Sequence, residues 1–284
     1  MKQVIACVDG PARAQGICDY AIWAARRLDT DLEFLHVQER QSEHAPLSDL
    51  SGSLWLGAQE ALLRELAELD ERRTALAREQ GRQILEMAVQ RARDQGATRI
   101  DARQRQGDLI ETLLEIEPDT RLFVLGQHEQ PVRPSRLLPD HRLEAAVRAL
   151  HRPILVATPV FHEPRRFMVA YDGSATSRKT VEMVGRSPLL AGLPAHVVLA
   201  GGESGAAAAA LEDARAQLAQ AGFDVRTAHV TGEPADALAE YARREDVDVL
   251  VMGAYGHSRI RHLMVGSTTT AILSQVRLPV LVLR

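Results

Sequence analysis

The sequence predicts an α/β fold made of two tandem doubly wound domains, each with a five-stranded parallel sheet flanked by helices. Three observations support this prediction. Short, continuous apolar runs alternate with longer stretches of helical periodicity, which is the pattern of βαβ units whose sheet is covered on both faces. Four sequence blocks recur in the same order in both halves. The 284 residues also suffice for two domains that each bury a core.

The repeated blocks define the domain organisation, because matched blocks in register indicate a duplicated unit. In chain order they are VIACVDG (4–10) with FMVAYDG (167–173), GDLIETLLE (107–115) with GEPADALAE (232–240), TRLFVLG (120–126) with VDVLVMG (247–253), and RPILVAT (152–158) with LPVLVLR (278–284). We therefore predict domain 1 over residues 1–158, a proline-bearing linker over 159–164, and domain 2 over 165–284.

The apolar runs and helical stretches of the second half give its elements in order. We expect strands at about 167–171, 195–200, 225–230, 247–252 and 279–283. Helices fill the intervals, at about 177–187, 206–221, 234–244 and 267–276.

The first half differs in the connection after its second strand, LEFLHV. A polar segment, 39–53, precedes a charged helical stretch from about Leu54 to Gln95. One face of that stretch carries Leu62, Leu66 and Leu69, followed further along by Ile84, Leu85 and Ala88. We expect this apolar stripe to pack on the chain's own sheet, and a partner-binding surface is the alternative.

Composition narrows the class of protein. A content of 45% hydrophobic and 25% charged residues is typical of a globular protein, and a formal net charge of −4 disfavours a nucleic-acid-binding surface. The sequence contains neither a membrane-spanning apolar run nor the apolar core of a signal peptide. The two cysteines, Cys7 and Cys18, lack metal-ligand or paired-disulfide spacing, which fits a reducing compartment. We expect a cytoplasmic protein that contacts neither membranes nor nucleic acid.

The segment 248–276 carries the strongest functional signal. A buried strand leads through Gly253, Gly256 and Gly266 into a helix that opens on Ser267. Free backbone N–H groups and the positive end of a helix dipole together favour a phosphate. Gly253 ends the strand where a β-carbon would crowd a ligand, and His257, next to Gly256, is the best placed of the loop's basic side chains.

On these residues the chain resembles the tandem members of the universal stress protein family, whose domains have the doubly wound fold known as adenine nucleotide α-hydrolase-like. Glycine, two residues, glycine, nine residues, glycine and serine resemble the motif of the family's ATP-binding branch. The resemblance implies a nucleotide site formed by Ala170, Tyr171, Asp172, Gly201, Met252, Gly253, Gly256, His257, Gly266, Ser267, Thr268 and Thr269.

Asp172 follows the first strand of the second half, where doubly wound folds bind ligands. The resemblance puts it beside the nucleoside, whereas helix capping is the alternative role for an aspartate in this position. Ala200 and Gly201 match the position where family backbones meet adenine, although glycine departs from the more usual apolar residue.

The first half does not keep the motif. Glu129 stands where the second glycine belongs, and Asp140 and His141 fall near the place of the final glycine and serine. A carboxylate repels phosphate, so we predict that the first half does not bind ATP in the family manner. His128 and these three residues lack recognisable metal-ligand spacing, and no metal site is expected.

The resulting hypothesis is a cytoplasmic protein that binds ATP with Mg²⁺ and acts as a nucleotide-dependent switch or sensor in stress responses. Because the sequence offers no P-loop lysine and no evident base, it predicts no catalytic residue and at most weak ATPase activity. The alternatives are an interaction module with a vestigial pocket and a slow ATP hydrolase. In the family, the last strand of each domain lies at the sheet edge and pairs domains, which implies an internal pseudo-dimer; a homodimer of two chains is a further alternative.

Overall fold

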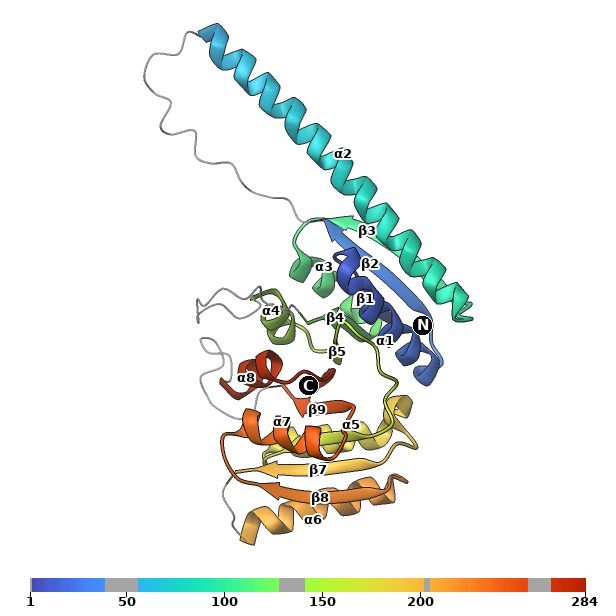
Figure 1. Cartoon of the computed structure of the whole chain (residues 1–284), viewed down its shortest axis with the longest axis vertical. Helices are drawn as coiled ribbons and strands as arrows, with labels where there is room; N and C mark the ends of the chain where they lie inside the picture. The colour runs from blue at the N-terminus through green and yellow to red at the C-terminus, as the bar shows by residue number, and fades with distance from the viewer. Residues whose placement is uncertain (1, 39–55, 128–140, 202–204, 255–266) are drawn as a thin grey trace.

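The computed structural model describes residues 2–38, 56–127, 141–201, 205–254 and 267–284. Their strands form one ten-stranded sheet, in the order β3-β2-β1-β4-β5-β10-β9-β6-β7-β8, with helices on both faces (Figure 1).

The elements follow the alternation that the sequence predicts. In the first half they are β1 (Gln3–Cys7), α1 (Pro11–Leu28), β2 (Leu32–Gln38), α2 (Leu56–Asp94), β3 (Ile100–Gln106), α3 (Leu109–Ile116), the 3₁₀ helix η2 (Glu117–Asp119), β4 (Thr120–Gly126), α4 (His141–Ala149) and β5 (Ile154–Ala157). In the second half they are β6 (Phe167–Tyr171), α5 (Ala175–Arg186), the 3₁₀ helix η3 (Pro188–Leu190), β7 (Ala195–Ala200), α6 (Gly205–Gln220), β8 (Val225–Val230), α7 (Pro234–Arg244), β9 (Val249–Gly253), α8 (Ser267–Gln275) and β10 (Val280–Leu283).

Each half is a parallel, doubly wound sheet, which confirms the predicted fold class. Strand β1 pairs with β2 and β4, and β6 pairs in the same way with β7 and β9. In such sheets the strand order reverses at the central strand and opens a crevice at the carboxyl ends of the strands. The reversal falls between β1 and β4 in the first half and between β6 and β9 in the second.

Strands β5 and β10 join the two halves. They pair in antiparallel fashion, with Leu155 opposite Leu281. This pairing covers the two apolar strands that would otherwise be exposed edges and leaves the polar strands β3 and β8 at the outside. Because the joint is antiparallel, the carboxyl ends of the first-half strands lie at the opposite edge of the sheet from those of the second half.

Two apolar cores fill the space between the sheet and the helices. One lies under α1, α2, α5 and α6, and the other lies under α3, α4, α7 and α8. Successive strand residues alternate between them: Val4 and Ala6 belong to the first core, and Ile5 belongs to the second. The inner strands are therefore buried on both faces, as their continuous apolar sequences predict, whereas the outer strands β3 and β8 are partly exposed.

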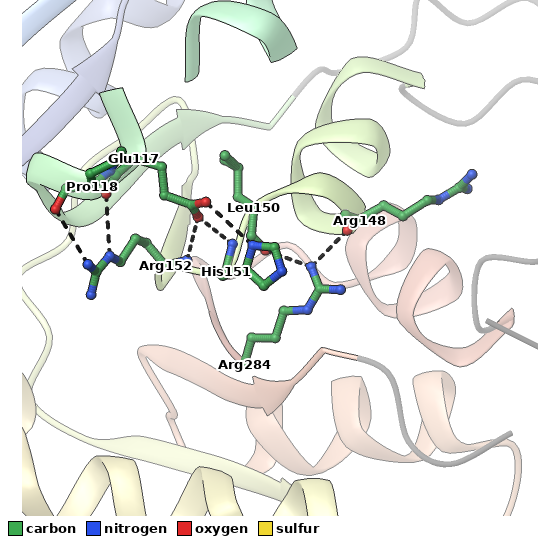
Figure 2. A network of polar contacts seen from close by, with 7 residues as sticks. All are labelled: Glu117, Pro118, Arg148, Leu150, His151, Arg152 and Arg284. Atoms are coloured by element: carbon green, nitrogen blue, oxygen red, sulfur yellow. Dashed lines mark hydrogen bonds and ion pairs between the residues drawn. The ribbon is translucent and has the colours of Figure 1, made fainter. Parts of the chain in front are cut away.

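Polar contacts also tie the halves together at the C-terminus of the chain (Figure 2). The guanidinium of Arg284 donates to the backbone oxygens of Arg148 and Leu150, at 2.7 and 2.8 Å, where α4 ends. Nearby, the carboxylate of Glu117 accepts from the backbone N–H groups of His151 and Arg152. The last residue of the chain thus satisfies carbonyls that a helix end leaves without partners.

The predicted linker region packs on the first half. The Phe161 ring lies edge-on to Tyr20 of α1, with ring centroids 4.7 Å apart, and the Tyr20 hydroxyl is 3.3 Å from the Thr158 hydroxyl. A β-carbon at Gly16 would lie 2.2 Å from the Thr158 carbonyl oxygen, so α1 and this segment approach closely because position 16 is glycine.

The prediction that the apolar stripe of the long helix α2 packs on the sheet is confirmed only in part. Ile84, Leu85 and Ala88 are buried in the core, as the stripe predicts. The expectation that the stripe packs on the sheet is wrong for Leu66 and Leu69, which are 41% and 48% exposed. The physical reason is that α2 extends beyond the sheet in its N-terminal part, so those side chains have no surface to cover (Figure 1).

Candidate nucleotide site at the carboxyl edge of the second half

Several of the predicted site residues meet at one edge of the sheet. Strands β6 and β9 are paired with Val169 opposite Val251, which brings the end of β6 at Tyr171 level with Gly253. Gly201 follows the neighbouring strand β7. Helix α8 begins at Ser267 and leads back to β10, which is parallel to β9, so its N-terminus belongs to this same edge.

Asp172 is exposed at the start of the turn after β6. Its Oδ1 accepts a hydrogen bond from the Ser174 backbone N–H at 2.9 Å. Burial raises the pKa of Asp172, but hydrogen bonds from Ser174 and Ser177 outweigh it and hold the pKa below its usual range. A carboxylate with a lowered pKa stays charged at neutral pH.

The helix-capping alternative for Asp172 is resolved by the neighbouring serine. Ser174 is the N-cap of α5, because its side chain accepts from the Ser177 backbone N–H at 3.1 Å. Asp172 stabilises the preceding turn instead, in which Gly173 has a φ of +73°. A sequence signal for this cap exists, since serine directly before a helical stretch is a preferred N-cap residue.

Two of the predicted site residues have buried side chains. Tyr171 and Met252 are 3% and 5% exposed and belong to the two apolar cores, whereas Ala170 is partly buried. Burial raises the pKa of the Tyr171 hydroxyl. Any contact of Tyr171 or Met252 with a ligand in the crevice would therefore involve backbone atoms.

The structure adds a second reason for glycine at position 253 to the one inferred from the sequence. A β-carbon there would lie 2.6 Å from Thr176 Cγ2 and 2.8 Å from Thr180 Oγ1, both on α5. It would collide with the helix, so glycine at 253 serves close helix–strand packing in addition to any role at a ligand. Gly201 has a φ of +138°, a conformation that favours glycine over the usual apolar residue.

The first turn of α8 contains three predicted residues, Ser267, Thr268 and Thr269. The Thr269 side chain is buried, and the side chains of Ser267 and Thr268 lie outside the described part of the structure. Thr270 Oγ1 is buried in the same turn and has no hydrogen-bond partner among the described residues. Gly256, His257 and Gly266 also lie outside the described residues.

The corresponding edge of the first half holds a small cavity. It has a volume of about 50 Å³ and is lined by Cys7, Val8, Asp9, Leu35, Val37, Leu109, Leu125, Gly126, Arg142 and Leu143. Ligand pockets for drug-sized molecules are several times larger, about 300–1,000 Å³. Glu129 and Asp140 lie outside the described residues, as does His128, and His141 begins α4. The absence of ATP binding in the first half stays a prediction.

Among the described residues, no three histidine, cysteine, aspartate or glutamate side chains gather closely enough to hold a metal ion. The helices in this part of the chain include none with the length and apolar character needed to cross a membrane.

Sequence reasoning missed one residue that links α8 to the first half of the molecule. Gln127, which follows β4 in the first half, donates its side-chain amide to the Leu273 and Val276 backbone oxygens at the end of α8. No local sequence signal could identify this contact, because its partners are more than a hundred residues away along the chain.

Fold and site together define a duplicated, doubly wound α/β protein whose predicted site residues Asp172, Gly201 and Gly253 lie at the carboxyl edge of its second half. The model of the Universal stress protein family matches residues 1–129 and 163–284, and the chain belongs to that family.

Known proteins resemble the chain over its whole length or over part of it. Universal stress protein Slr1230 from Synechocystis is 32% identical over 100% of both chains. The crystal structure of a universal stress protein from Archaeoglobus fulgidus covers 99% of this chain and 96% of its own length, with a TM-score of 0.67 and 15% identity. A shorter universal stress protein, solved in complex with cAMP, is 27% identical and covers 43% of this chain and 98% of its own, with a TM-score of 0.37.

Proposed function

We propose that the second half of this universal stress protein binds ATP with Mg²⁺ and that nucleotide occupancy is a switch read by the rest of the chain. The observation that carries the proposal is the meeting, at one sheet edge, of a charged Asp172 with the N-terminus of α8, in the half whose sequence keeps the glycine motif.

The residues at this edge fit a ligand that has an anionic group near the N-terminus of α8 and a polar group near Asp172. The first four backbone N–H groups of α8 have no acceptor within the helix, and the helix dipole favours negative charge there. The buried Thr270 hydroxyl adds a further unmet hydrogen bond in the same turn. Asp172, with its lowered pKa, is suited to accept hydrogen bonds from a ribose or to bind Mg²⁺, which would neutralise part of the phosphate charge.

Helix α8 is the element through which occupancy would reach the first half. Its N-terminus opens on the proposed phosphate site, and its C-terminal carbonyls accept from Gln127, next to Gly126 at the first-half crevice. A ligand that shifts or rigidifies α8 would therefore act on both crevices. This contact favours a switch over a simple store of nucleotide.

Calorimetric titration with ATP and Mg²⁺, together with the nucleotide content of the purified protein, tests the proposal. Asp172→Asn should weaken binding about tenfold or more, since hydrogen bonds to charged groups contribute about 1.5–3 kcal/mol. Asparagine retains an oxygen that can accept from Ser174. The matched control is Asp9→Asn, the same change in the first half, which should leave ATP affinity unchanged.

Replacing Gly266 by a bulky residue should abolish binding while the circular dichroism spectrum stays native. Failure of the wild-type protein to bind ATP or to carry it through purification would refute the proposal. If the wild type releases more phosphate than the Gly266 variant, the slow-hydrolase alternative is supported. If bound ATP survives long incubation, that alternative is contradicted.

A further inference from the structure

The N-terminal part of α2 projects away from the sheet (Figure 1). The helix packs closely on the sheet at Gly81, where a β-carbon would lie 2.5 Å from both Gln104 Nε2 and His36 Cδ2. Beyond this point toward the N-terminus, none of the described side chains from residue 64 to residue 80 is buried. An isolated helix in water is marginally stable, and most helices gain stability by covering an apolar face.

The projecting part carries such a face. Leu66, Leu69 and Leu76 are 41%, 48% and 61% exposed, which makes them three of the large exposed apolar residues of the described chain. Their spacings of three and seven residues correspond to the a and d positions of a heptad, with Arg73 at the a position between Leu69 and Leu76. Met87, 52% exposed, occupies a later a position of the same heptad register, on the flank of α2 beside the buried Ile84.

Charge is distributed unevenly along this part of the helix. Residues 64–71 contain four carboxylates and one arginine, whereas residues 72–82 contain four arginines and one carboxylate. The ion pairs within the helix, such as Arg72 with Glu68 at 3.8 Å, join exposed side chains and contribute little. The acidic segment of one helix would therefore complement the basic segment of a second helix that runs in the opposite direction.

We propose that two copies of this chain associate through α2 as an antiparallel coiled coil, centred near Glu71. In this arrangement Leu66 packs against Leu76 of the partner subunit, and Arg73 lies beside Leu69 of the partner subunit. A parallel pair would instead align like charges and bring the two Arg73 side chains together. Antiparallel helix dipoles also attract each other.

A second copy fits this surface because both complementary parts are on the same helix, as a two-fold symmetric interface requires. Each copy supplies an acidic and a basic segment, and the stripe that joins them consists of Leu66, Leu69 and Leu76, interrupted by Arg73. Strands β5 and β10 are paired with each other inside the chain, so neither is an open edge for a second copy. Among the described helices, α2 exposes four large apolar side chains, whereas α3 exposes Leu114.

Size-exclusion chromatography with light scattering tests the association. The wild-type chain should be a dimer at micromolar concentration, and Leu69→Glu combined with Leu76→Glu should make it a monomer with an unchanged circular dichroism spectrum. The matched control is Leu114→Glu on α3, where a leucine is exposed to a similar extent, 42%, and this variant should stay dimeric. A monomeric wild type, or a double variant that remains dimeric, would overturn the proposal.

Cysteine cross-linking tests the orientation. A mixture of Leu66→Cys and Leu76→Cys chains should form a disulfide-linked dimer on mild oxidation, whereas either variant alone should not. Burial raises the pKa of both native thiols, to about 12 for Cys18, so Cys7 and Cys18 should contribute little background. Cross-linking of Leu66→Cys chains to each other would contradict the antiparallel arrangement.

Discussion

The side-chain amide of Gln127 donates to the backbone oxygen of Leu273 at 2.8 Å and thereby connects the two halves of the chain. The same amide lies 3.2 Å from the Val276 oxygen, so it caps the C-terminal end of α8. Arg284 makes the reciprocal contact at the end of α4. Both contacts are possible because the antiparallel joint between β5 and β10 brings the carboxyl edge of each half beside the helix ends of the other.

Replacing Gln127 by leucine should lower the free energy of unfolding by about 1–2 kcal/mol, because two carbonyls of α8 lose their hydrogen-bond donor. Gln127→Glu should cost more, since it adds negative charge at the negative end of a helix. Urea unfolding measures both effects. Gln90→Leu is the control, because the Gln90 amide bonds only with an exposed side chain of its own helix, Asp94, and this change should have little effect. Equal losses for Gln127→Leu and Gln90→Leu would contradict the capping role.

The Gly253→Ala variant should be destabilised by about 1–3 kcal/mol, since the added methyl would enter the space of Thr176 and Thr180. The equivalent change in the first half, Gly126→Ala, provides the comparison. There the added methyl would meet Ile17 Cδ1 at 2.8 Å, the end of a flexible side chain that can rotate. Thermal and urea unfolding should therefore rank Gly253→Ala as the more damaging of the two. The reverse order would show that close packing of α5 does not explain glycine at 253.

Gly16→Ala should destabilise the chain by about 3 kcal/mol, at the upper end of the range for overpacking. The β-carbon would lie 2.2 Å from the Thr158 oxygen and 2.5 Å from the Pro159 oxygen, and backbone atoms cannot rotate away as a side chain can. Besides unfolding, limited proteolysis of residues 158–164 measures whether the linker is released from α1. A variant as stable as the wild type would mean that this segment adapts at little cost.

The free energy of unfolding should decrease as the pH is lowered, because of the buried histidine of β7. His196 is 2% exposed, and its Nδ1 is 2.8 Å from the Tyr241 hydroxyl. Burial, followed by nearby Arg166, lowers the pKa of His196 below its ordinary value of 6.5. Between pH 6.5 and the lower pKa of the folded state, the unfolded chain therefore binds a proton that the folded chain does not. The free energy of unfolding decreases as pH falls through this window.

Urea unfolding of the wild type and His196→Gln between pH 7 and about pH 5 checks this effect. Glutamine does not titrate, so the stability difference between the two proteins should narrow as pH falls. His162→Gln, at an exposed position, is the control and should keep the pH profile of the wild type. If the stability difference between the wild type and His196→Gln stays constant with pH, the lowered pKa of His196 is contradicted.

Elements with strong local signals could be predicted from the sequence. The predicted second-half strands 167–171 and 195–200 coincide with β6 and β7, because apolar runs between turn residues define them locally. The predicted strand 225–230 coincides with β8, whose residues are more polar and whose place follows from the alternation of strands and helices. The boundaries of α7 were likewise correct. Ser174 was missed as the N-cap because Asp172 has the same local chemistry, and only the geometry of the turn distinguishes them.

The sequence by itself determined the duplication, the doubly wound fold of each half and the asymmetry between an intact and an altered glycine motif, because these depend on residue type and spacing along the chain. The tertiary structure decided which residues meet across the chain. It showed that Gly253 makes room for α5, that Gln127 caps α8 and that the leucines of α2 extend beyond the sheet. The reason is that a local pattern reports which face of an element is apolar, whereas its partner depends on where distant segments end in space.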